Sequence, residues 1–419
     1  MDKIVIRGGA PLKGTVTISG SKNATLPIMA ASILGNGSCT IHNVPDLVDI
    51  ATMARIMERF GVKSERENHT LTIHPAKLTS WEAPYDLVRT MRASFLVLGP
   101  LLARLGKARV SLPGGCAIGP RPIDMHLKAL EELGARIRVE KGYVEASARR
   151  LKGATVGLDI PTVTGTENIM MAACLAQGRT VIENAAREPE VVDLAEFLKK
   201  MGARISGEGS SVITIEGVKS LKRPVEHAVI PDRVEAGTFL IAAMITRSRL
   251  TLQGVSPECF GTVESKLKEA GARIEFHNNQ CTIQGPRLVR AENITTSPYP
   301  GFPTDLQAQW MALMAVAGGT STITETMFEN RYMQAAELMR MGAQIKLRGQ
   351  SAVIKGVPHL SGAKVMASDL RASAALILAG LVARGKTEIR RIYHLDRGYE
   401  RIEEKLKALG ARIERVKDR

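Results

Sequence analysis

The sequence predicts an α/β protein of two domains, each built from three copies of one repeated unit. The first observation is length, because 419 residues with 44% hydrophobic content exceed what one core usually organises. The second is a recurring signal, a glycine followed by Ala-Arg, Ala-Gln or Val-Lys, between a helix-like segment and an alternating strand. It returns every 68 to 73 residues, at Gly61, Gly134, Gly202, Gly271, Gly342 and Gly410.

The elements of the unit follow one another in a fixed order. An amphipathic stretch, such as residues 124–133, predicts a helix, and the glycine after it can take the left-handed conformation that ends a helix. Alternating apolar residues with a turn at Gly or Asn then predict a hairpin, as in residues 135–146. An Ala-, Leu- and Met-rich segment, such as 23–34 or 372–385, predicts a helix buried on all sides, and a short strand follows it.

The two ends of the chain complete the same unit. The last unit stops at residues 411–419 without the second strand of its hairpin, and residues 4–8 resemble that strand. We therefore expect an N-terminal domain of residues 22–229 and a C-terminal domain of residues 1–21 plus 230–419. A solenoid fits less well, because solenoid repeats usually have roughly 20–45 residues.

Composition narrows the class of protein. No apolar run reaches the roughly 20 residues that span a membrane, and no signal-peptide run is present, so we expect a cytoplasmic protein without a membrane partner. Five cysteines without a CxxC pair indicate neither a disulfide framework nor a zinc site. The net charge of +15 leaves open a nucleic-acid partner, small polyanions or a basic surface with no partner. Only 4% aromatic residues argue against stacking on single strands.

Polar residues stand at the start of the predicted buried helices. Most are expected to be ordinary caps, but Lys22, Arg92 and Arg371 place a cation at the positive end of a helix dipole. A helix start with a nearby cation is suited to bind an anion. At the same position Asp305 is a candidate general base, and Asp369 is a possible second carboxylate.

The loop at residues 113–124 is rich in Gly and Pro and longer than its counterparts, which suits a mobile lid. It holds Cys116, and a cysteine near cations can act as an acid or a nucleophile; the other four cysteines are expected to be inert. Arg121 and Arg397 each stand 13 residues before a recurring glycine, one in each predicted domain. Facing each other they would clamp a phosphate or carboxylate; the alternative is two solvated arginines.

Three segments are the most distinctive: SGSKNATLPIMAASIL at 19–34, LPGGCAIGPRPIDMHLKALEELGA at 112–135 and FPTDLQAQWMAL at 302–313. They closely resemble the bacterial UDP-N-acetylglucosamine enolpyruvyl (1-carboxyvinyl) transferases. The resemblance runs over the whole chain, and the Lys22-Asn23 and Gly-Gly-Cys116 motifs are specific to it. It implies an inside-out α/β barrel fold with pseudo-threefold symmetry in each of two domains, in agreement with the repeats.

The resemblance implies the first committed step of peptidoglycan synthesis. The enolpyruvyl group of phosphoenolpyruvate moves to the 3-hydroxyl of UDP-N-acetylglucosamine, and phosphate is released by addition–elimination through a tetrahedral ketal. No metal, organic cofactor or nucleic-acid partner is implied, and the protein is expected to be a monomer. Arginines in both predicted domains lead us to expect that ligand binding draws the two halves together and orders the Cys116 loop.

The resemblance also implies residue roles. Phosphoenolpyruvate would be held by Lys22, Asn23, Arg121 and Arg397. The UDP-sugar would be contacted by Arg92, Arg121, Pro122, Ile123, Asp124, Met125, Pro161, Thr162, Val163, Thr164, Asp305 and Met327. Asp305 would take the hydroxyl proton, and Cys116 would act as general acid or in product release and be alkylated by fosfomycin. The site would be supported by Arg331, Asp369 and Arg371.

Two positions depart from the family pattern. Pro120 stands where a small residue is usual, and residues 162–166 read TVTGT where SVGAT is usual, which puts fine contacts to the sugar in doubt.

Three other functions stand as alternatives to this transferase reaction. The sister enolpyruvylshikimate-phosphate synthases read Gly-Ser-Lys-Ser in the first motif and lack the Gly-Gly-Cys loop. An RNA-terminal cyclase or other nucleic-acid binder would show a basic face and steep salt dependence. Intact Lys22, Cys116, Asp305 and Arg397 argue against an inactive paralogue.

Overall fold

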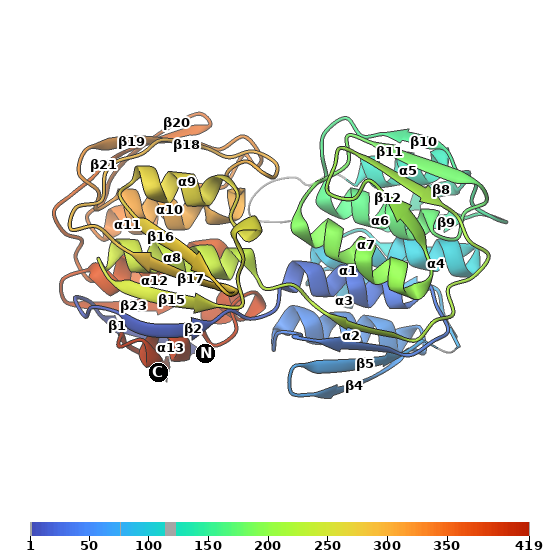
Figure 1. The fold of residues 1–419 in the computed structure, drawn as a ribbon, viewed down its shortest axis with the longest axis horizontal. Coiled ribbons are helices and arrows are strands. Elements are labelled where there is room, and N and C mark those ends of the chain that lie inside the picture. The colour runs from blue at the N-terminus through green and yellow to red at the C-terminus, as the bar shows by residue number, and fades with distance from the viewer. Residues whose placement is uncertain (1, 76, 114–122, 419) are drawn as a thin grey trace. The chain divides into compact units, whose positions relative to one another are not determined.

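The computed structural model describes residues 2–75, 77–113 and 123–418, and the chain forms two compact units (Figure 1). One unit holds the described residues of 1–19 and 231–419, and the other those of 20–116 and 121–230. The chain passes from one unit to the other after Ser19 and again after Ile230. Each unit has its own hydrophobic core.

Each unit carries three four-stranded sheets of one common pattern. In each sheet an edge strand pairs in parallel with a second strand, and two antiparallel strands complete the order. In the unit of residues 20–230 the orders are β14 (Val225–Ala228), β3 (Cys39–His42), β5 (Thr70–His74), β4 (Lys63–Glu67); β6 (Glu82–Ala83), β7 (Lys107–Ser111), β9 (Tyr143–Ser147), β8 (Arg136–Glu140); and β10 (Thr155–Gly157), β11 (Arg179–Glu183), β13 (Val212–Glu216), β12 (Arg204–Ser206).

The other unit repeats the pattern, with the N-terminal strand as a central member of one sheet. Its orders are β22 (Lys364–Met366), β23 (Lys386–Arg390), β1 (Asp2–Arg7), β24 (Arg412–Lys417); β2 (Lys13–Thr17), β15 (Arg249–Gln253), β17 (Gln280–Gln284), β16 (Arg273–His277); and β18 (Ile294–Thr295), β19 (Thr320–Thr324), β21 (Ser351–Lys355), β20 (Gln344–Arg348). β1 pairs antiparallel with β23 and β24 and so stands where the second hairpin strand stands in the other sheets.

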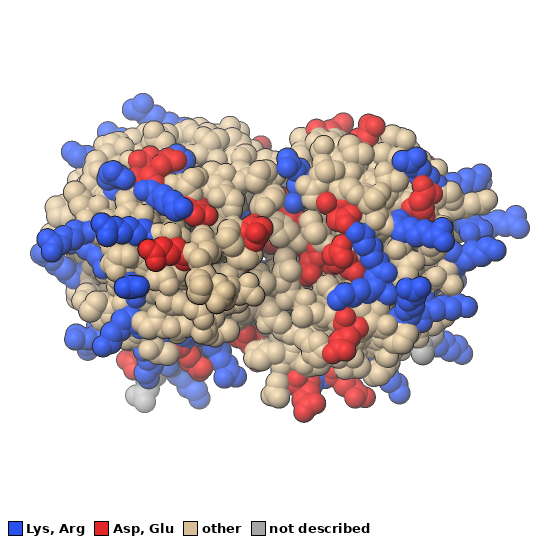
Figure 2. Space-filling model, in the orientation of Figure 1, with Lys and Arg blue, Asp and Glu red and all other residues tan. Residues whose placement is uncertain are grey.

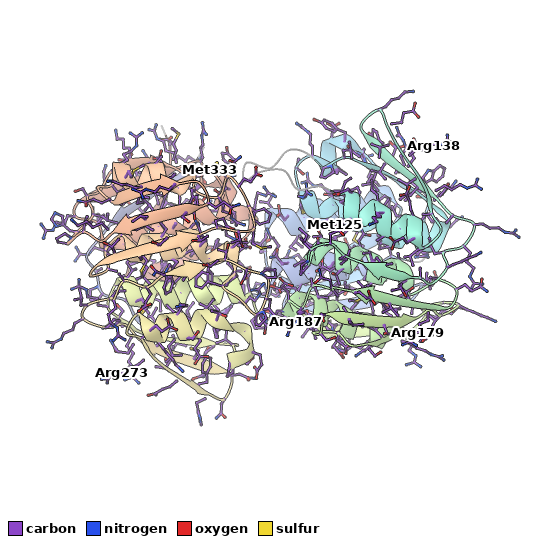
Figure 3. The ribbon with its side chains drawn as sticks, turned by 90° about the horizontal axis from the view of Figure 1, so that it is seen from above. Met125, Arg138, Arg179, Arg187, Arg273 and Met333 are labelled. Carbon is purple, nitrogen blue, oxygen red and sulfur yellow. The ribbon has the colours of Figure 1, made fainter. Side chains whose placement is uncertain are left out.

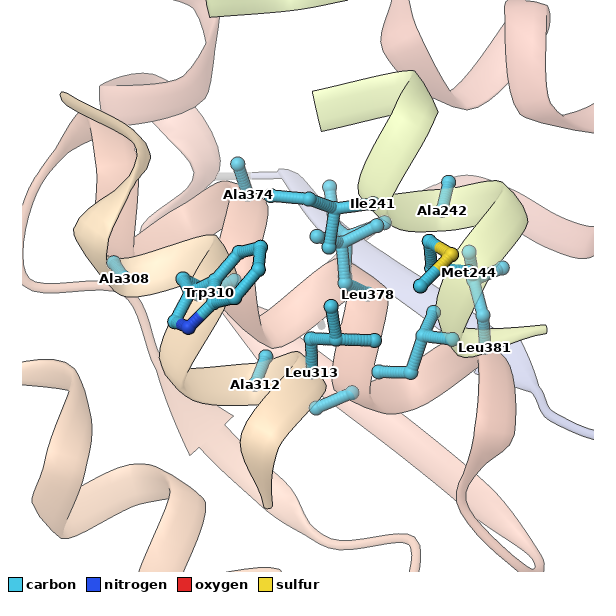
Figure 4. Close-up of a cluster of buried hydrophobic side chains, with 14 of the residues drawn as sticks. Ile241, Ala242, Met244, Ala308, Trp310, Ala312, Leu313, Ala374, Leu378 and Leu381 are labelled. Atoms are coloured by element: carbon cyan, nitrogen blue, oxygen red, sulfur yellow. The ribbon is translucent and has the colours of Figure 1, made fainter. Parts of the chain in front are cut away.

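Helices fill the centre of each unit. They are α1 (Lys22–Ser32), α4 (Leu98–Leu105) and α6 (Val163–Ala173) in one unit, and α8 (Arg233–Ile245), α10 (Gln307–Met314) and α12 (Leu370–Val382) in the other. Nearly every side chain of α8, α10 and α12 is buried, as an apolar sequence without a polar face requires. Figure 4 shows these three helices packed around Ile241, Trp310, Leu313 and Leu378.

A second set of helices packs on the sheets: α2 (Val48–Arg59), α5 (Asp124–Glu132), α7 (Pro189–Met201), α9 (Thr262–Glu269), α11 (Gln334–Arg340) and α13 (Ile402–Ala408). The six recurring glycines that follow them have φ between 86° and 110°. The left-handed conformation expected at these glycines is confirmed, and it lets each helix stop and the next strand begin. Shorter elements are α3 (Tyr85–Val88), η1 (Arg92–Val97), η2 (Pro257–Cys259), η3 (Thr304–Leu306) and η4 (Ile392–Arg397).

The buried segment before β7 differs from the single helix that its composition predicts. It is a 3₁₀ helix of six residues, η1, followed by the eight-residue α4. Pro100 has no N–H group and suits the first turn of an α-helix, where that group would have no partner within the helix, and α4 begins at Leu98, two residues before it.

Basic residues are spread widely over the surface. On the face shown in Figure 2, Lys and Arg are distributed over both units and interspersed with Asp and Glu. Arg138, Arg179 and Arg273 are exposed examples on β8, β11 and β16 (Figure 3). In the described part of the chain, no helix has the length and apolar character needed to cross a membrane.

Candidate active site

Asp305 and two arginines form an ionic cluster in the unit that holds residues 231–418. Asp305 lies in η3, directly before α10. Nη2 of Arg371, the second residue of α12, donates a hydrogen bond to Oδ2 of Asp305 at 2.6 Å. Nη2 of Arg331 donates to Oδ1 at 2.7 Å. Each carboxylate oxygen is therefore bound by a different guanidinium group, and such charge-assisted bonds are strong.

The cluster holds Asp305 as an anion. Burial alone would raise the pKa of this carboxyl, but the attraction and hydrogen bonds of Arg371 and Arg331 outweigh burial and hold the pKa well below its ordinary value. The Asp305 side chain is 27% exposed, whereas those of Arg331 and Arg371 are 7% and 6% exposed. The carboxylate is thus the most accessible part of the cluster.

Both arginines keep a spare donor. Among the described residues, Nη1 of Arg331 and Nη1 of Arg371 are buried and have no hydrogen-bond partner. Leaving a buried charged donor without a partner costs free energy, so an oxygen acceptor that reaches these two groups removes that cost. A phosphate or carboxylate has the oxygens that two guanidinium groups bind best.

Asp369 caps the helix that carries Arg371. It is the N-cap of α12, and its Oδ1 accepts from the backbone N–H groups of Arg371 at 2.8 Å and Ala372 at 3.0 Å. A capping carboxylate satisfies N–H groups that have no partner within the helix. Asp369 therefore fixes the turn that carries Arg371, while its Oδ1 is fully occupied.

Glu325, which the sequence did not single out, connects Met327 to the Asp305 segment. Its carboxylate is buried; Oε1 accepts from the Met327 backbone N–H at 2.9 Å and from the hydroxyl of Thr296 at 2.8 Å. Oε2 accepts from the hydroxyl of Thr304 at 2.8 Å, and Thr304 immediately precedes Asp305. One carboxylate thus holds two segments that carry predicted sugar contacts.

Arg397 lies at the end of η4 and is half-buried. Two residues later, the ring of the buried Tyr399 has its centroid 5.6 Å from the guanidinium carbon of Arg371. The segment that carries Arg397 therefore runs beside the Asp305 cluster.

In the other unit, Lys22 and Asn23 are the first two residues of α1. The hydroxyl of Ser21 caps this helix by accepting from the Ala24 N–H at 3.3 Å. Nζ of Lys22 donates to Oδ2 of Asp49 in α2 at 3.1 Å, while Asn23 is exposed. The ion pair with Asp49 offsets the unfavourable position of a cation at a helix start.

Three predicted sugar contacts line one small cavity. Arg92, Ile123 and Thr164 surround it together with Phe95, Leu96 and His126. Its volume is about 10 Å³, close to the room that one water molecule needs. Arg92 and Thr164, 72 positions apart in the chain, thus meet at one place in this unit.

His126 in this cavity was missed by sequence reasoning, because a single histidine on an amphipathic helix carries no distinctive signal. Burial, and then the charge of Arg92, lower its pKa to about 4, so the ring is neutral. Nδ2 of Asn168 lies 3.2 Å from Nδ1, and an amide nitrogen only donates, so Nδ1 is the acceptor. The proton then sits on Nε2, 3.4 Å from the Thr164 hydroxyl.

The remaining predicted residues lie as follows. Asp124 and Met125 are the first residues of α5, Pro161 precedes α6, Thr162 caps α6 by accepting from the Gly165 N–H at 3.3 Å, and Val163 begins it. Cys116, Arg121 and Pro122 lie outside the described residues. Within the described ranges, no three His, Cys, Asp or Glu side chains gather closely enough to hold a metal ion.

Comparison with known proteins places the chain in a family. The family described as EPSP synthase (3-phosphoshikimate 1-carboxyvinyltransferase) matches residues 6–406. The UDP-N-acetylglucosamine 1-carboxyvinyltransferase of Myxococcus xanthus is 58% identical, with both chains covered in full. The protein of that name from Desulfatibacillum aliphaticivorans is 56% identical over the full length of both.

The chain belongs to the UDP-N-acetylglucosamine 1-carboxyvinyltransferase family. The enolpyruvyl transferase NikO from Streptomyces tendae has a similar structure, with a TM-score of 0.89 and 27% identity over 100% of this chain and 99% of that one. An EPSP synthase from Acinetobacter baumannii shares the fold over the full length of both chains, with a TM-score of 0.79 and 20% identity. The family and the enolpyruvyl transferase fold expected from the sequence are confirmed.

Proposed function

We propose that this chain transfers the enolpyruvyl group of phosphoenolpyruvate to the 3-hydroxyl of UDP-N-acetylglucosamine and releases phosphate. The observation that carries the proposal is the full-length identity of 56–58% to proteins named for this transfer. The family motifs at Lys22-Asn23 and Asp305 support it. The relatives favour this reaction over the shikimate and nucleic-acid alternatives, because those closely related over the full chain carry the UDP-N-acetylglucosamine name.

The reaction proceeds by addition and elimination. The sugar 3-oxygen bonds to C2 of phosphoenolpyruvate while C3 gains a proton and the hydroxyl proton leaves, which gives a tetrahedral ketal. The bond from C2 to the phosphate oxygen then breaks, C3 loses a proton and the double bond forms again. The enzyme therefore has to accept a hydroxyl proton, protonate a carbon and stabilise a departing phosphate.

Asp305 is the proposed acceptor of the hydroxyl proton. With Arg331 and Arg371 bound to it, its lowered pKa makes it a weak base. An anionic substrate that binds the spare Nη1 donors of both arginines draws positive charge away from the carboxylate. The basicity of Asp305 then rises when the anion is in place, so that proton transfer depends on a bound co-substrate.

The other assignments rest on the family motifs. Lys22, Asn23, Arg121 and Arg397 hold phosphoenolpyruvate, with Arg331, Asp369 and Arg371 in support. Arg92, Ile123 and Thr164 lie close together in one unit, as residues that contact one sugar nucleotide would. The further sugar contacts are Pro122, Asp124, Met125, Pro161, Thr162, Val163 and Met327. No metal or organic cofactor takes part in the proposed reaction.

Cys116 is the proposed general acid at the methylene carbon and the residue that fosfomycin alkylates. Its role is supported by the Gly-Gly-Cys motif alone. We place the protein in the cytoplasm, since Cys39, Cys174, Cys259 and Cys281 are free thiols and suit a reducing compartment. We further propose a monomer, because each unit has its own core and needs no partner subunit to form one.

Phosphate release from phosphoenolpyruvate tests the proposal, with UDP-N-acetylglucosamine or shikimate 3-phosphate as acceptor. We expect release only with the sugar nucleotide, and loss of release after fosfomycin treatment. Cys116→Ala should no longer be labelled by fosfomycin, whereas the matched control Cys259→Ala should still be labelled and inhibited. Release with shikimate 3-phosphate, or with neither acceptor, would refute the reaction; labelling of Cys116→Ala would refute only the role of that residue.

A further inference from the structure

We propose that Tyr399 is a positioning residue for enolpyruvyl transfer, because its buried hydroxyl joins α8 to α10 next to Asp305 and its ring lies against Arg371. The inference rests on the proposed function for its kinetic part. Tyr399 is 2% exposed and so does not reach a substrate itself. It acts through the residues that it contacts.

The neighbours of the Tyr399 hydroxyl determine which hydrogen bond it donates and which it accepts. The Thr238 hydroxyl donates to the Val234 backbone oxygen at 2.8 Å, so its single proton is used within α8. Thr238 Oγ1 therefore accepts from the Tyr399 hydroxyl, 2.9 Å away. Nε2 of Gln309 in turn donates to the Tyr399 oxygen at 3.0 Å. The phenol thus both gives and accepts a hydrogen bond in the helical core.

Gln309 links the Tyr399 hydroxyl to the backbone of Asp305. The same Nε2 that donates to Tyr399 donates to the backbone oxygen of Asp305 at 3.1 Å. Gln309 is fully buried in α10, one turn after Asp305, so its amide fixes the junction between η3 and α10. The direction in which the Asp305 carboxylate projects depends on that junction.

The ring of Tyr399 reaches the other partner of the carboxylate. The Arg371 guanidinium carbon lies 5.6 Å from the ring centroid, within range of a cation–π attraction. Arg371 holds Oδ2 of Asp305 at 2.6 Å. Tyr399 therefore contacts the Asp305 cluster twice, through the Asp305 backbone by way of Gln309 and through its side chain by way of Arg371.

The residues beside Tyr399 fix its own backbone. Glu400 accepts from the hydroxyl of Ser19 at 2.8 Å, and Nζ of Lys405 donates to the same hydroxyl at 2.7 Å. The backbone N–H of Ser19 donates to Glu235 of α8 at 2.7 Å. Ser19 is the last residue before the chain passes to the other unit. The segment of Tyr399 is thus held at the place where the chain leaves this unit.

The buried polar side chains of Thr238, Gln309 and Tyr399 are not explained by a gain in fold stability. The surrounding helices α8, α10 and α12 are otherwise largely apolar, and burying a hydroxyl or an amide costs free energy unless every bond is replaced. Among the described residues, Oε1 of Gln309 is buried and has no partner, so this network carries a cost that an apolar core would avoid. Its contacts to Asp305 and Arg371 account for its presence.

The test removes one oxygen atom. Tyr399→Phe should lower kcat by about ten- to a hundredfold, because small displacements of a catalytic group cost about that much, while KM for phosphoenolpyruvate stays within about threefold. Tyr332→Phe is the matched control, since the hydroxyl of this buried residue donates to the backbone oxygens of Ile323 and Gln350 and not to the Asp305 cluster. It should lower the melting temperature similarly and leave kcat near the wild-type value. If Tyr399→Phe does not fold, Thr238→Val removes the same bond with little change of shape and should reproduce the loss of kcat.

Crystal structures of the wild type and Tyr399→Phe decide the positioning role independently of the reaction. A displaced Asp305 carboxylate, or a broken bond between Asp305 and Arg371, is expected in the variant. An unchanged cluster together with wild-type kcat would overturn the proposal. If the wild type itself releases no phosphate, the proposed function fails, while these structures still decide whether Tyr399 positions Asp305.

Discussion

Arg371 in α12 donates a 2.6 Å hydrogen bond to Oδ2 of Asp305 in η3, although the two residues lie 66 positions apart in the chain. Arg331 binds the other carboxylate oxygen. The arrangement keeps an accessible carboxylate ionised and leaves one spare donor on each buried arginine. We propose that an anion bound at these donors raises the basicity of Asp305.

Asp305→Asn should lower kcat by about 10²- to 10⁴-fold, the usual contribution of a general base. It also removes the anion that both arginines share, so Arg331 and Arg371 should bind inorganic phosphate more tightly than in the wild type. Isothermal titration with phosphate measures this second effect. An unchanged kcat, or weaker phosphate binding, would contradict the role given to the cluster.

Asp369→Ala should act mainly on stability. It removes the cap of α12, which typically costs about 0.5–2 kcal/mol of unfolding free energy. Urea unfolding measures the loss, and Asp232→Ala, which removes the comparable cap of α8, is the matched comparison. We expect kcat to fall far less than in Asp305→Asn. A kcat loss as large as that of Asp305→Asn, without a loss of stability, would make Asp369 a second catalytic carboxylate.

Glu325→Gln should weaken the binding of the sugar nucleotide more than the binding of phosphoenolpyruvate. An amide group in place of the carboxylate loses one of the two acceptor oxygens that hold Thr304 and Met327, so these segments no longer share one anchor. We expect KM for UDP-N-acetylglucosamine to rise about tenfold, a loss of about 1.4 kcal/mol of binding free energy. Equal changes in both KM values would show that Glu325 acts on the whole unit.

His126 should make the protein sensitive to mild acid. Burial and Arg92 lower its folded pKa from 6.5 to about 4, so the fold favours the neutral ring. Its stabilising effect is therefore complete above pH 6.5 and declines as the pH falls toward 4, by on the order of 3 kcal/mol. Unfolding free energies of the wild type and His126→Gln should converge over that pH range. Parallel curves would show that His126 does not titrate as stated.

The repeated architecture could be read from the sequence because each unit carries the same local signals. The six glycines mark helix ends, and their positive φ values were predictable, since a side chain is unfavourable there. The apolar composition of α12 likewise indicated a helix without a solvent face. Pro100 shows where such reading fails, since the apolar pattern alone did not reveal that α4 would begin only at Leu98.

The partners within the site could not be read in this way. Asp305, Arg331 and Arg371 come from three segments, and only the fold brings them together. Glu325 and Tyr399 appear in the sequence as ordinary residues after a strand and a 3₁₀ helix, because their hydrogen bonds go to distant positions. Sequence reasoning singled out Asp305, Arg331 and Arg371 and missed Glu325 and Tyr399, whose hydrogen bonds hold the surrounding segments.

The most direct test of the account follows the labelled carbon of phosphoenolpyruvate. The wild type is incubated with UDP-N-acetylglucosamine and [2-¹³C]phosphoenolpyruvate, and the product is examined by nuclear magnetic resonance. We predict one phosphate released per sugar nucleotide consumed, with the labelled carbon bonded to the 3-oxygen of the sugar as an enol ether. Label recovered as free pyruvate, or bonded to another oxygen, would contradict the account.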